Sequence, residues 1–215
     1  MYQTFFKRFL DIFLSLFAII VLSPIFVILI IIGTIMMKGN PFFIQERAGK
    51  REKRFNLIKF RTMTNAKDKD GKLLPGKDRL NRYGRLIRSL SIDELPSLIN
   101  ILRGDLSIIG PRPLPMKYLS YYTETERRRY EVSPGLTGLA QCMGRNNLSW
   151  EDKFAYDVEY VDNLSFLLDV KILFKTAVSV LKREGIGQGE QQPISLHIER
   201  MNWVYEEEKS EEVNI

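Results

Sequence analysis

Residues 88–113, RSLSIDELPSLINILRGDLSIIGPRP, place opposite charges around a short apolar segment. Asp93 and Glu94 are adjacent carboxylates at the predicted start of a helix, and a Pro-Arg-Pro turn centred on Arg112 follows. A helix start presents free backbone N–H groups to an anion. Two carboxylates beside a phosphate repel it unless a hard cation such as Mg²⁺ lies between them. The stretch therefore indicates a phosphate-handling site in which one carboxylate is free to attack phosphorus.

The same residues also have structural explanations. Ser91 and Glu94 fit a capping box, with Ser91 as the cap and Glu94 as the third helical residue. Pro96 is best tolerated in a first turn, so a helix start nearer to Pro96 fits as well. Arg112 is either a fixed phosphate clamp or an incidental arginine on a stiff surface turn. The sequence leaves these alternatives open.

Composition restricts the chemistry. The chain has one His, His197, and one Cys, Cys142. Proton transfer by histidine, a Cys/His zinc site and a paired disulfide are therefore not expected. Residues 1–113 carry 20 Lys/Arg and 9 Asp/Glu, and residues 114–215 carry 12 and 17. A basic half attracts phosphorylated substrates, anionic lipid or nucleic acid.

Residues 9–37 form an apolar run with one charge, Asp11. This run exceeds the roughly 20 residues that cross a bilayer, and it is too long for a signal peptide. Ser23 and Pro24 interrupt it, and Ser23 is placed to bond a carbonyl that the proline leaves without a donor. Basic residues flank both ends, which favours cytosolic flanks. A re-entrant helix and a Pro-kinked spanning helix both remain open.

The rest of the chain predicts a mainly helical α+β fold with a small β-hairpin over residues 41–63 and amphipathic helices on the membrane surface. Residues 133–141, SPGLTGLAQ, read as turns because they contain Pro134, Gly135 and Gly138. Asp157 and Asp169 lie on helical faces where an Asp is usually exposed to solvent. Further helices are predicted at 80–90, 114–130, 149–163 and 166–183, with a loop at 64–77.

The end of the chain differs in composition from the rest. After about residue 185, Gly and Gln lead to an acidic tail, which predicts weak order. Trp203 and Tyr205 are the expected anchors of this tail.

Four motifs follow one another along the chain: KRFLDI with the Ser-Pro break, FIQERAGKREKRFNLIKFRTM, LIRSLSIDELPSLINILRGDLSIIGPRP and SPGLTGLAQCMGRNNLSWEDKFAYDVEYV. In this order they resemble the bacterial sugar transferase family, the small monotopic polyprenol-phosphate phosphoglycosyl transferases. The overall length is most similar to the members that transfer phospho-bacillosamine or a related N-acetylated sugar. The resemblance runs over roughly residues 1–185.

The resemblance implies a division of the chain and of its site residues. Residues 1–38 would be a re-entrant membrane helix broken at Ser23-Pro24, 39–185 a cytosolic catalytic domain and 186–215 a C-terminal extension. Asp93 would be the nucleophile that displaces UMP from a UDP-sugar, and Glu94 would assist it, with Mg²⁺ held at both. The implied substrate-binding residues are Lys59, Arg88, Arg112, Arg145 and Asp169.

The function that we expect is transfer of a phosphosugar to a polyprenol phosphate such as undecaprenyl phosphate, without a nucleic-acid partner. The enzyme would act on the cytoplasmic face of the bacterial inner membrane, with both termini in the cytosol, as the first membrane step of glycoconjugate assembly. One competing hypothesis is a non-enzymatic, membrane-anchored protein that binds anionic lipid or nucleic acid. Another is a transferase that moves the sugar without its phosphate and releases UDP instead of UMP.

Overall fold

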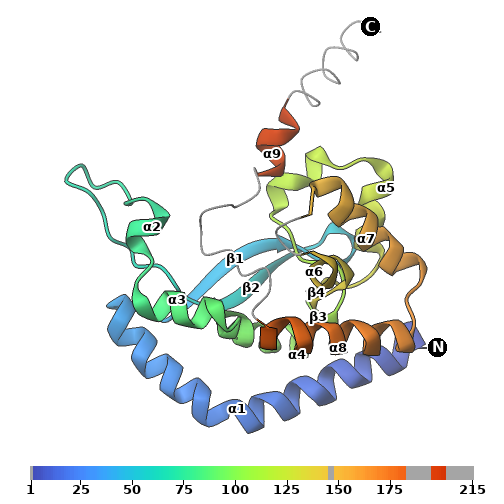
Figure 1. The fold of residues 1–215 in the computed structure, drawn as a ribbon, viewed down its shortest axis with the longest axis horizontal. Coiled ribbons are helices and arrows are strands. Elements are labelled where there is room, and N and C mark those ends of the chain that lie inside the picture. Colours follow the sequence, from blue (N-terminus) through green and yellow to red (C-terminus); the bar gives the residue numbers. More distant parts are fainter. Residues whose placement is uncertain (1, 145–147, 183–194, 202–215) are drawn as a thin grey trace, which may run out of the picture.

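A computed structural model of the protein describes residues 2–144, 148–182 and 195–201. Within these ranges the fold is α+β and mainly helical, as predicted. A long helix, α1 (Lys7–Met37), runs along one side of a globular body that contains all the strands (Figure 1). A short π-helical stretch, Tyr2–Phe6, precedes α1.

The strands form two small sheets in the described part of the chain. The predicted hairpin is confirmed: β1 (Phe42–Ala48) pairs antiparallel with β2 (Arg54–Phe60), and Phe43 lies opposite Lys59. A second, parallel pair joins β3 (Ser107–Ile109) to β4 (Gly135–Thr137).

The parallel pair corrects the prediction of turns in residues 133–141. Glycine made this segment resemble a turn, but the structure uses it for close approach between backbones. A Cβ added to Gly135 would lie 2.0 Å from the backbone nitrogen of Gly110. The segment is therefore a strand followed by α6 (Leu139–Met143).

The helices predicted at 80–90, 149–163 and 166–183 are confirmed. The first is α3 (Arg82–Ser89), preceded by the short α2 (Gly76–Arg79). The other two are α7 (Trp150–Asp162) and α8 (Phe166–Lys182). Ser149 caps α7 by accepting a hydrogen bond from the Asp152 backbone N–H at 3.0 Å.

The prediction of a single helix at 114–130 is wrong, because the helical segment is interrupted at Thr123. The hydroxyl of Thr123 accepts from the Glu126 backbone, and the Glu126 carboxylate accepts from the Thr123 N–H, so these residues form a capping box. This box starts a new helix instead of letting the preceding one continue. The segment consists of a 3-10 helix (Met116–Tyr121), α5 (Glu124–Arg127) and a second 3-10 helix (Arg128–Glu131).

Helix α1 bends near its middle (Figure 1), where Pro24 lies within the helix. Proline 24 has no N–H to give to the carbonyl of Ile20, and the hydroxyl of Ser23 donates to that carbonyl at 2.8 Å. The bond expected from Ser23 is thereby confirmed. Among the described residues α1 is the one helix long and apolar enough to cross a membrane, and most of it is exposed.

Both ends of α1 contact the globular body. Near its start Asp11 accepts hydrogen bonds from the Ser107 hydroxyl at 2.8 Å and the Ile108 N–H at 2.9 Å. Near its end Leu29 and Met37 pack into a cluster with Tyr83, whose hydroxyl donates to the Leu29 carbonyl at 3.2 Å. The two halves of α1 therefore hold the body by different means, one polar and one apolar.

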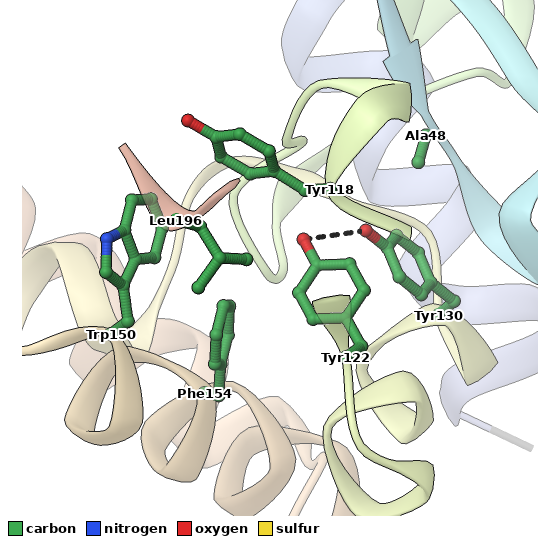
Figure 2. Close-up of a cluster of buried hydrophobic side chains, with 7 residues drawn as sticks. All are labelled: Ala48, Tyr118, Tyr122, Tyr130, Trp150, Phe154 and Leu196. Carbon is green, nitrogen blue, oxygen red and sulfur yellow. Dashed lines mark hydrogen bonds between the residues drawn. The ribbon is translucent and has the colours of Figure 1, made fainter. Parts of the chain in front are cut away.

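An aromatic cluster lies at the other side of the body. Figure 2 shows its buried side chains, among which Leu196 comes from α9 (Leu196–Glu199) near the C-terminus. The anchors predicted for this end, Trp203 and Tyr205, lie outside the described residues. Sequence reasoning did not single out Leu196 as a contact of this segment. The cluster consists of Ala48, Tyr118, Tyr122, Tyr130, Trp150, Phe154 and Leu196.

Candidate active site

Asp93 and Glu94 lie in the first turn of a 3-10 helix, Ile92–Ser97, which leads into α4 (Leu98–Arg103). Side-chain hydrogen bonds hold this segment against β2. The Ser97 hydroxyl donates to the Ile58 carbonyl at 2.8 Å, and the Ile58 N–H donates to the Asn100 side chain at 3.0 Å. Asp93 and Glu94, called the dyad below, are thereby fixed next to Lys59. The helix start predicted for Asp93 and Glu94 is confirmed.

Sequence reasoning missed the positioning roles of Ser97 and Asn100. Both side chains are fully buried, and Asn100 also donates to the Asn56 carbonyl at 2.8 Å. The available signal was two polar residues three positions apart inside the apolar run that follows the dyad. Buried polar groups need partners, and here the partners are backbone groups of β2.

Glu94 is held by two cations instead of by a helix cap. Its Oε1 accepts hydrogen bonds from Lys59 Nζ at 2.5 Å and from Arg112 Nη2 at 2.9 Å. Ser91 has a left-handed backbone and makes no side-chain cap bond, so the capping-box interpretation is wrong. Burial by itself raises the pKa of Glu94, but the charges of Arg112 and Lys59 outweigh burial and lower it to about 2. Glu94 is therefore ionised at neutral pH.

Asp93 has a different environment from its neighbour. Within the described ranges its carboxylate makes no hydrogen bond or ion pair, and the side chain is partly exposed. Burial raises the pKa of Asp93, and the negative charge of Glu94 raises it further. A carboxylate without intramolecular partners and with a raised pKa is more basic than Glu94, which suits a nucleophile.

The Pro-Arg-Pro turn is fixed by three segments distant in sequence. The Pro111 carbonyl accepts from the Gly135 N–H at 2.8 Å, and the Leu114 carbonyl accepts from the Ala48 N–H at 3.0 Å. Between them, the carbonyl of Arg112 accepts from Nη2 of Arg129 at 2.7 Å. Arg112 therefore projects from a rigid backbone, which favours a fixed clamp over an incidental surface arginine.

A cavity of about 1060 Å³ opens beside the dyad. Cavities of this size accommodate a nucleotide-sized ligand. Arg88 lines it and donates from Nε to the Thr62 hydroxyl at 2.8 Å. Basic side chains outnumber acidic ones in the wall, which suits a polyanionic ligand. The charged lining residues are Arg47, Lys59, Arg61, Arg79, Arg88, Arg112, Arg129, Lys153, Asp93, Glu94 and Asp157.

The structure brings Lys59, Arg88 and Arg112 together with the dyad, but Asp169 does not line this cavity. Asp169 is 4% exposed and joins the start of α1 to α7 and α8. It accepts from Lys7 Nζ and from the Tyr160 hydroxyl, each at 2.7 Å. The expected substrate contact of Asp169 therefore has no geometric support. Arg145 lies outside the described residues.

Asp157 is buried as well, with 3% exposure. Its Oδ2 accepts from Nη2 of Arg129 at 2.7 Å and from Nε at 3.0 Å. The prediction that Asp157 and Asp169 are exposed on helical faces is wrong for both. Each has a cationic partner from elsewhere in the chain, and periodicity along one helix does not reveal such a partner.

The dyad provides a donor set that fits Mg²⁺. In residues 2–144, 148–182 and 195–201 there is no group of three or more His, Cys, Asp or Glu side chains that could hold a metal ion by itself. Mg²⁺ is usually bound by one or two carboxylates together with substrate phosphates and water. In the part of the chain that the structure describes, the Asp93 carboxylate makes no hydrogen bond, and the contacts of Lys59 and Arg112 to Glu94 both fall on Oε1. These carboxylates therefore suit an ion that arrives with a phosphate ligand.

Comparison with known proteins assigns the class. Residues 2–183 match the family described as bacterial sugar transferase. The chain belongs to this family, and it is an enzyme of the phosphoglycosyl transferase class. The resemblance seen in the sequence is confirmed, and the hypothesis of a non-enzymatic binding protein is wrong.

Individual relatives cover most of this chain. It is 55% identical over 184 residues to the uncharacterized sugar transferase EpsL of Bacillus subtilis, covering 85% of this chain and 90% of that protein. It is 35% identical over 189 residues to the UDP-glucose:undecaprenyl-phosphate glucose-1-phosphate transferase of Caulobacter vibrioides, covering 81% and 69%. It is also 35% identical over 185 residues to the UDP-N-acetylgalactosamine-undecaprenyl-phosphate N-acetylgalactosaminephosphotransferase of Aeromonas hydrophila, covering 82% and 44%.

Proposed function

We propose that the protein transfers a phosphosugar from a UDP-sugar to a polyprenol phosphate, with undecaprenyl phosphate as the acceptor, and releases UMP. The observation that carries this proposal is the position of Asp93 beside Lys59, Arg88 and Arg112 on the wall of one large cavity. Among the described residues, the Asp93 carboxylate makes no hydrogen bond or ion pair. The names of the Caulobacter and Aeromonas relatives support the same donor and acceptor classes. The reaction commits a soluble sugar to the membrane for glycoconjugate assembly.

The proposed reaction proceeds in two displacements at one phosphorus. First, a carboxylate oxygen of Asp93 attacks the sugar-bearing phosphorus, the bond to the bridging oxygen breaks, and UMP leaves with that oxygen. An acyl phosphate then links Asp93 to the sugar. Next, a phosphate oxygen of the polyprenol phosphate attacks the same phosphorus and Asp93 leaves as a free carboxylate. The product is a polyprenyl-diphosphate sugar, and all atoms of donor and acceptor are accounted for.

The neighbouring residues orient and stabilise the reacting groups. Arg112 and Arg88 are the donors for the phosphate oxygens, because their guanidinium groups line the cavity beside Asp93. Lys59 and Arg112 keep Glu94 ionised, so that Glu94 contributes a negative charge at one fixed position. Mg²⁺ held by Asp93 and Glu94 would offset the repulsion between the carboxylates and the phosphates of the donor.

Product analysis tests the proposal. A panel of UDP-sugars, including glucose and N-acetylated sugars, is incubated with the purified protein, undecaprenyl phosphate and Mg²⁺. The proposal predicts UMP and a lipid diphosphate sugar in equal amounts from at least one donor. Release of UDP would assign the chain to sugar transfer without phosphate. Replacing Mg²⁺ with EDTA is predicted to stop UMP release.

We further propose that α1 is a re-entrant membrane helix and that both termini are in the cytosol. The 31 residues of α1 would extend about 47 Å if straight, more than the roughly 30 Å hydrocarbon core. Instead, α1 bends and both of its ends contact one globular body (Figure 1). A charged body cannot lie on both faces of a membrane, so this arrangement supports entry and exit on the same, cytoplasmic face.

The same arrangement places other apolar surfaces near the membrane. Helices α3, α4 and α8 lie in a row alongside α1 (Figure 1). Exposed apolar side chains on this row include Leu86 of α3, Leu167 and Phe174 of α8. We propose that these helices rest in the lipid headgroup region, as expected for amphipathic interfacial helices.

Cysteine accessibility tests the topology. Single cysteines at Tyr2 and Lys50, in a Cys142→Ser background, are treated with a membrane-impermeant thiol reagent in intact bacteria. Both sites are predicted to resist labelling until the cells are opened. Labelling of the Tyr2 site alone from outside would establish a spanning helix. Replacing Ser23 and Pro24 with leucine is predicted to favour spanning, because both the break and its polar compensation are lost.

A further inference from the structure

The segment 195–201 lies beyond the family match, which ends at residue 183, yet it packs on the catalytic body. Leu196 is fully buried in the aromatic cluster of Figure 2, where it lies next to Trp150 and Phe154. Arg200 is 2% exposed, although Arg is rarely buried without a partner. A segment that only trailed along the surface would not bury these two side chains.

Arg200 connects three parts of the body. Its Nη1 and Nη2 donate to the two carboxylate oxygens of Glu126 at 2.7 and 2.8 Å, which is a bidentate ion pair. Nη2 also donates to Glu151 at 2.8 Å, and Nη1 donates to the Tyr121 carbonyl at 2.9 Å. The guanidinium carbon lies 5.4 Å from the centre of the Phe154 ring. Arg200 therefore ties the 121–126 segment to the first turns of α7.

The first turns of α7 form one wall of the 1060 Å³ cavity beside Asp93 and Glu94. Trp150, Lys153 and Phe154 all line that cavity. Lys153 Nζ lies 4.6 Å from the centre of the Trp150 ring, so the position of this cation depends on the position of the indole. Arg200 holds Glu151, which directly follows Trp150 in the first turn of α7.

We infer that residues 195–201 act as a clasp that sets the position of the Trp150–Phe154 wall and thereby the binding of the UDP-sugar, with Arg200 as the positioning residue. The part of this inference that concerns the donor rests on the proposed function. None of residues 195–201 lines the cavity, so loss of the clasp is expected to affect how the donor is held more than how phosphorus is attacked.

Two readouts test the clasp in the full-length protein. The chain has two tryptophans, Trp150 and Trp203, so acrylamide quenching in a Trp203→Phe background reports on Trp150 alone. Arg200→Ala is expected to raise the quenching constant of Trp150 about twofold, because Arg200 holds Glu151 and the Phe154 ring that stacks on the indole. In kinetics it is expected to raise the donor KM about fivefold and to leave kcat within about twofold. Arg200→Lys is expected to raise the donor KM less than Arg200→Ala does.

Arg128→Ala is the matched control. Arg128 also holds α7, through Asp162 at its far end, and does not line the cavity. The Arg128→Ala variant is expected to leave both the Trp150 quenching constant and the donor KM unchanged. If Arg200→Ala does not fold, Glu151→Gln weakens the same clasp from its exposed side, and an increase of about twofold in the donor KM is expected.

The outcomes separate this inference from the proposed function. Unchanged Trp150 quenching in folded Arg200→Ala, or in Glu151→Gln if Arg200→Ala does not fold, would overturn the clasp. Equal changes in Arg128→Ala would also overturn it, because they would show a general loss of stability. If the wild-type protein releases no UMP from any UDP-sugar, the proposed function fails, while quenching still decides whether 195–201 positions the wall.

Discussion

Two ion-pair networks border the same cavity and differ in their access to it. Glu94 with Lys59 and Arg112 forms the open network, in which the Arg112 side chain is 47% exposed. Arg129 with Asp157 forms the closed network, in which the side chains are 1% and 4% exposed. Arg112 belongs to both, because its carbonyl accepts a hydrogen bond from Arg129.

This difference in exposure suggests that the open network takes part in the reaction and that the closed network stabilises the fold. Cations in the open network can exchange part of their contact with Glu94 for a phosphate ligand, because they face the cavity. The closed network is too buried for exchange, and removing one of its partners leaves an uncompensated buried charge. It holds the backbone from which Arg112 projects. Changes in the open network should therefore alter turnover, and changes in the closed network should alter stability.

The largest effect is expected at a residue that belongs to neither network. Asp93→Asn replaces the proposed nucleophile with an amide, which is a very poor nucleophile, and leaves both ion networks intact. UMP release is predicted to fall by about 10⁴-fold or more. The thermal unfolding temperature, measured alongside in the same detergent, is predicted to remain close to that of the wild type. UMP release near the wild-type rate would exclude Asp93 as the nucleophile.

Glu94→Gln tests the open network. It keeps the shape of the side chain but removes the charge that Lys59 and Arg112 face, and turnover is predicted to fall by about 10²–10⁴-fold. The loss of stability is predicted to be only about 1 kcal/mol, because the network is open to water on one side. A large loss of stability with normal turnover would reverse the roles of the two networks.

Asp157→Asn tests the closed network. It leaves Arg129 buried without its countercharge, so the free energy of unfolding is predicted to fall by about 3–5 kcal/mol. Chemical denaturation of both proteins in one detergent measures this change. Glu46→Gln is the control, since Glu46 and Arg54 form an exposed ion pair, and such pairs contribute about 0–1 kcal/mol. Equal stability changes in the two variants would contradict the distinction.

The smallest effect in this series is expected from Arg112→Lys. The charge remains, but the planar set of donors that reaches Glu94 and that we propose to bind a phosphate is lost. A decrease of about tenfold in kcat/KM for the donor is predicted, which corresponds to about 1.4 kcal/mol. Donor titrations of the variant and the wild type measure it. Wild-type kinetics in Arg112→Ala would show that Arg112 does not clamp the phosphate.

Local patterns in the sequence predicted the parts of the fold that depend on near neighbours. The hairpin, the cap of α7 by Ser149 and the bond from Ser23 to the carbonyl left by Pro24 are of this kind. The charge pattern of residues 88–113 singled out Asp93, Glu94 and Arg112. The family resemblance added Lys59 and Arg88, and the structure brings all five residues to one cavity.

Local patterns could not predict features that depend on partners distant in sequence. A capping box was one of two interpretations left open at Ser91, and it does not form because Glu94 is engaged by Lys59 on β2 and by Arg112. A capping box that sequence reasoning did not single out forms at Thr123. Burial of Asp157 depends on Arg129, 28 residues away. The docking of Leu196 depends on aromatic residues from three separate segments.

Intact-protein mass spectrometry gives the most direct test of the central claim, that Asp93 carries the phosphosugar. The wild-type protein is incubated with the preferred UDP-sugar and Mg²⁺ in the absence of lipid, and the adduct is mapped by peptide fragmentation. We predict a mass increase equal to one sugar phosphate, located on Asp93, which disappears when undecaprenyl phosphate is added. An adduct mapped to Glu94, or the same adduct in Asp93→Asn, would contradict the account.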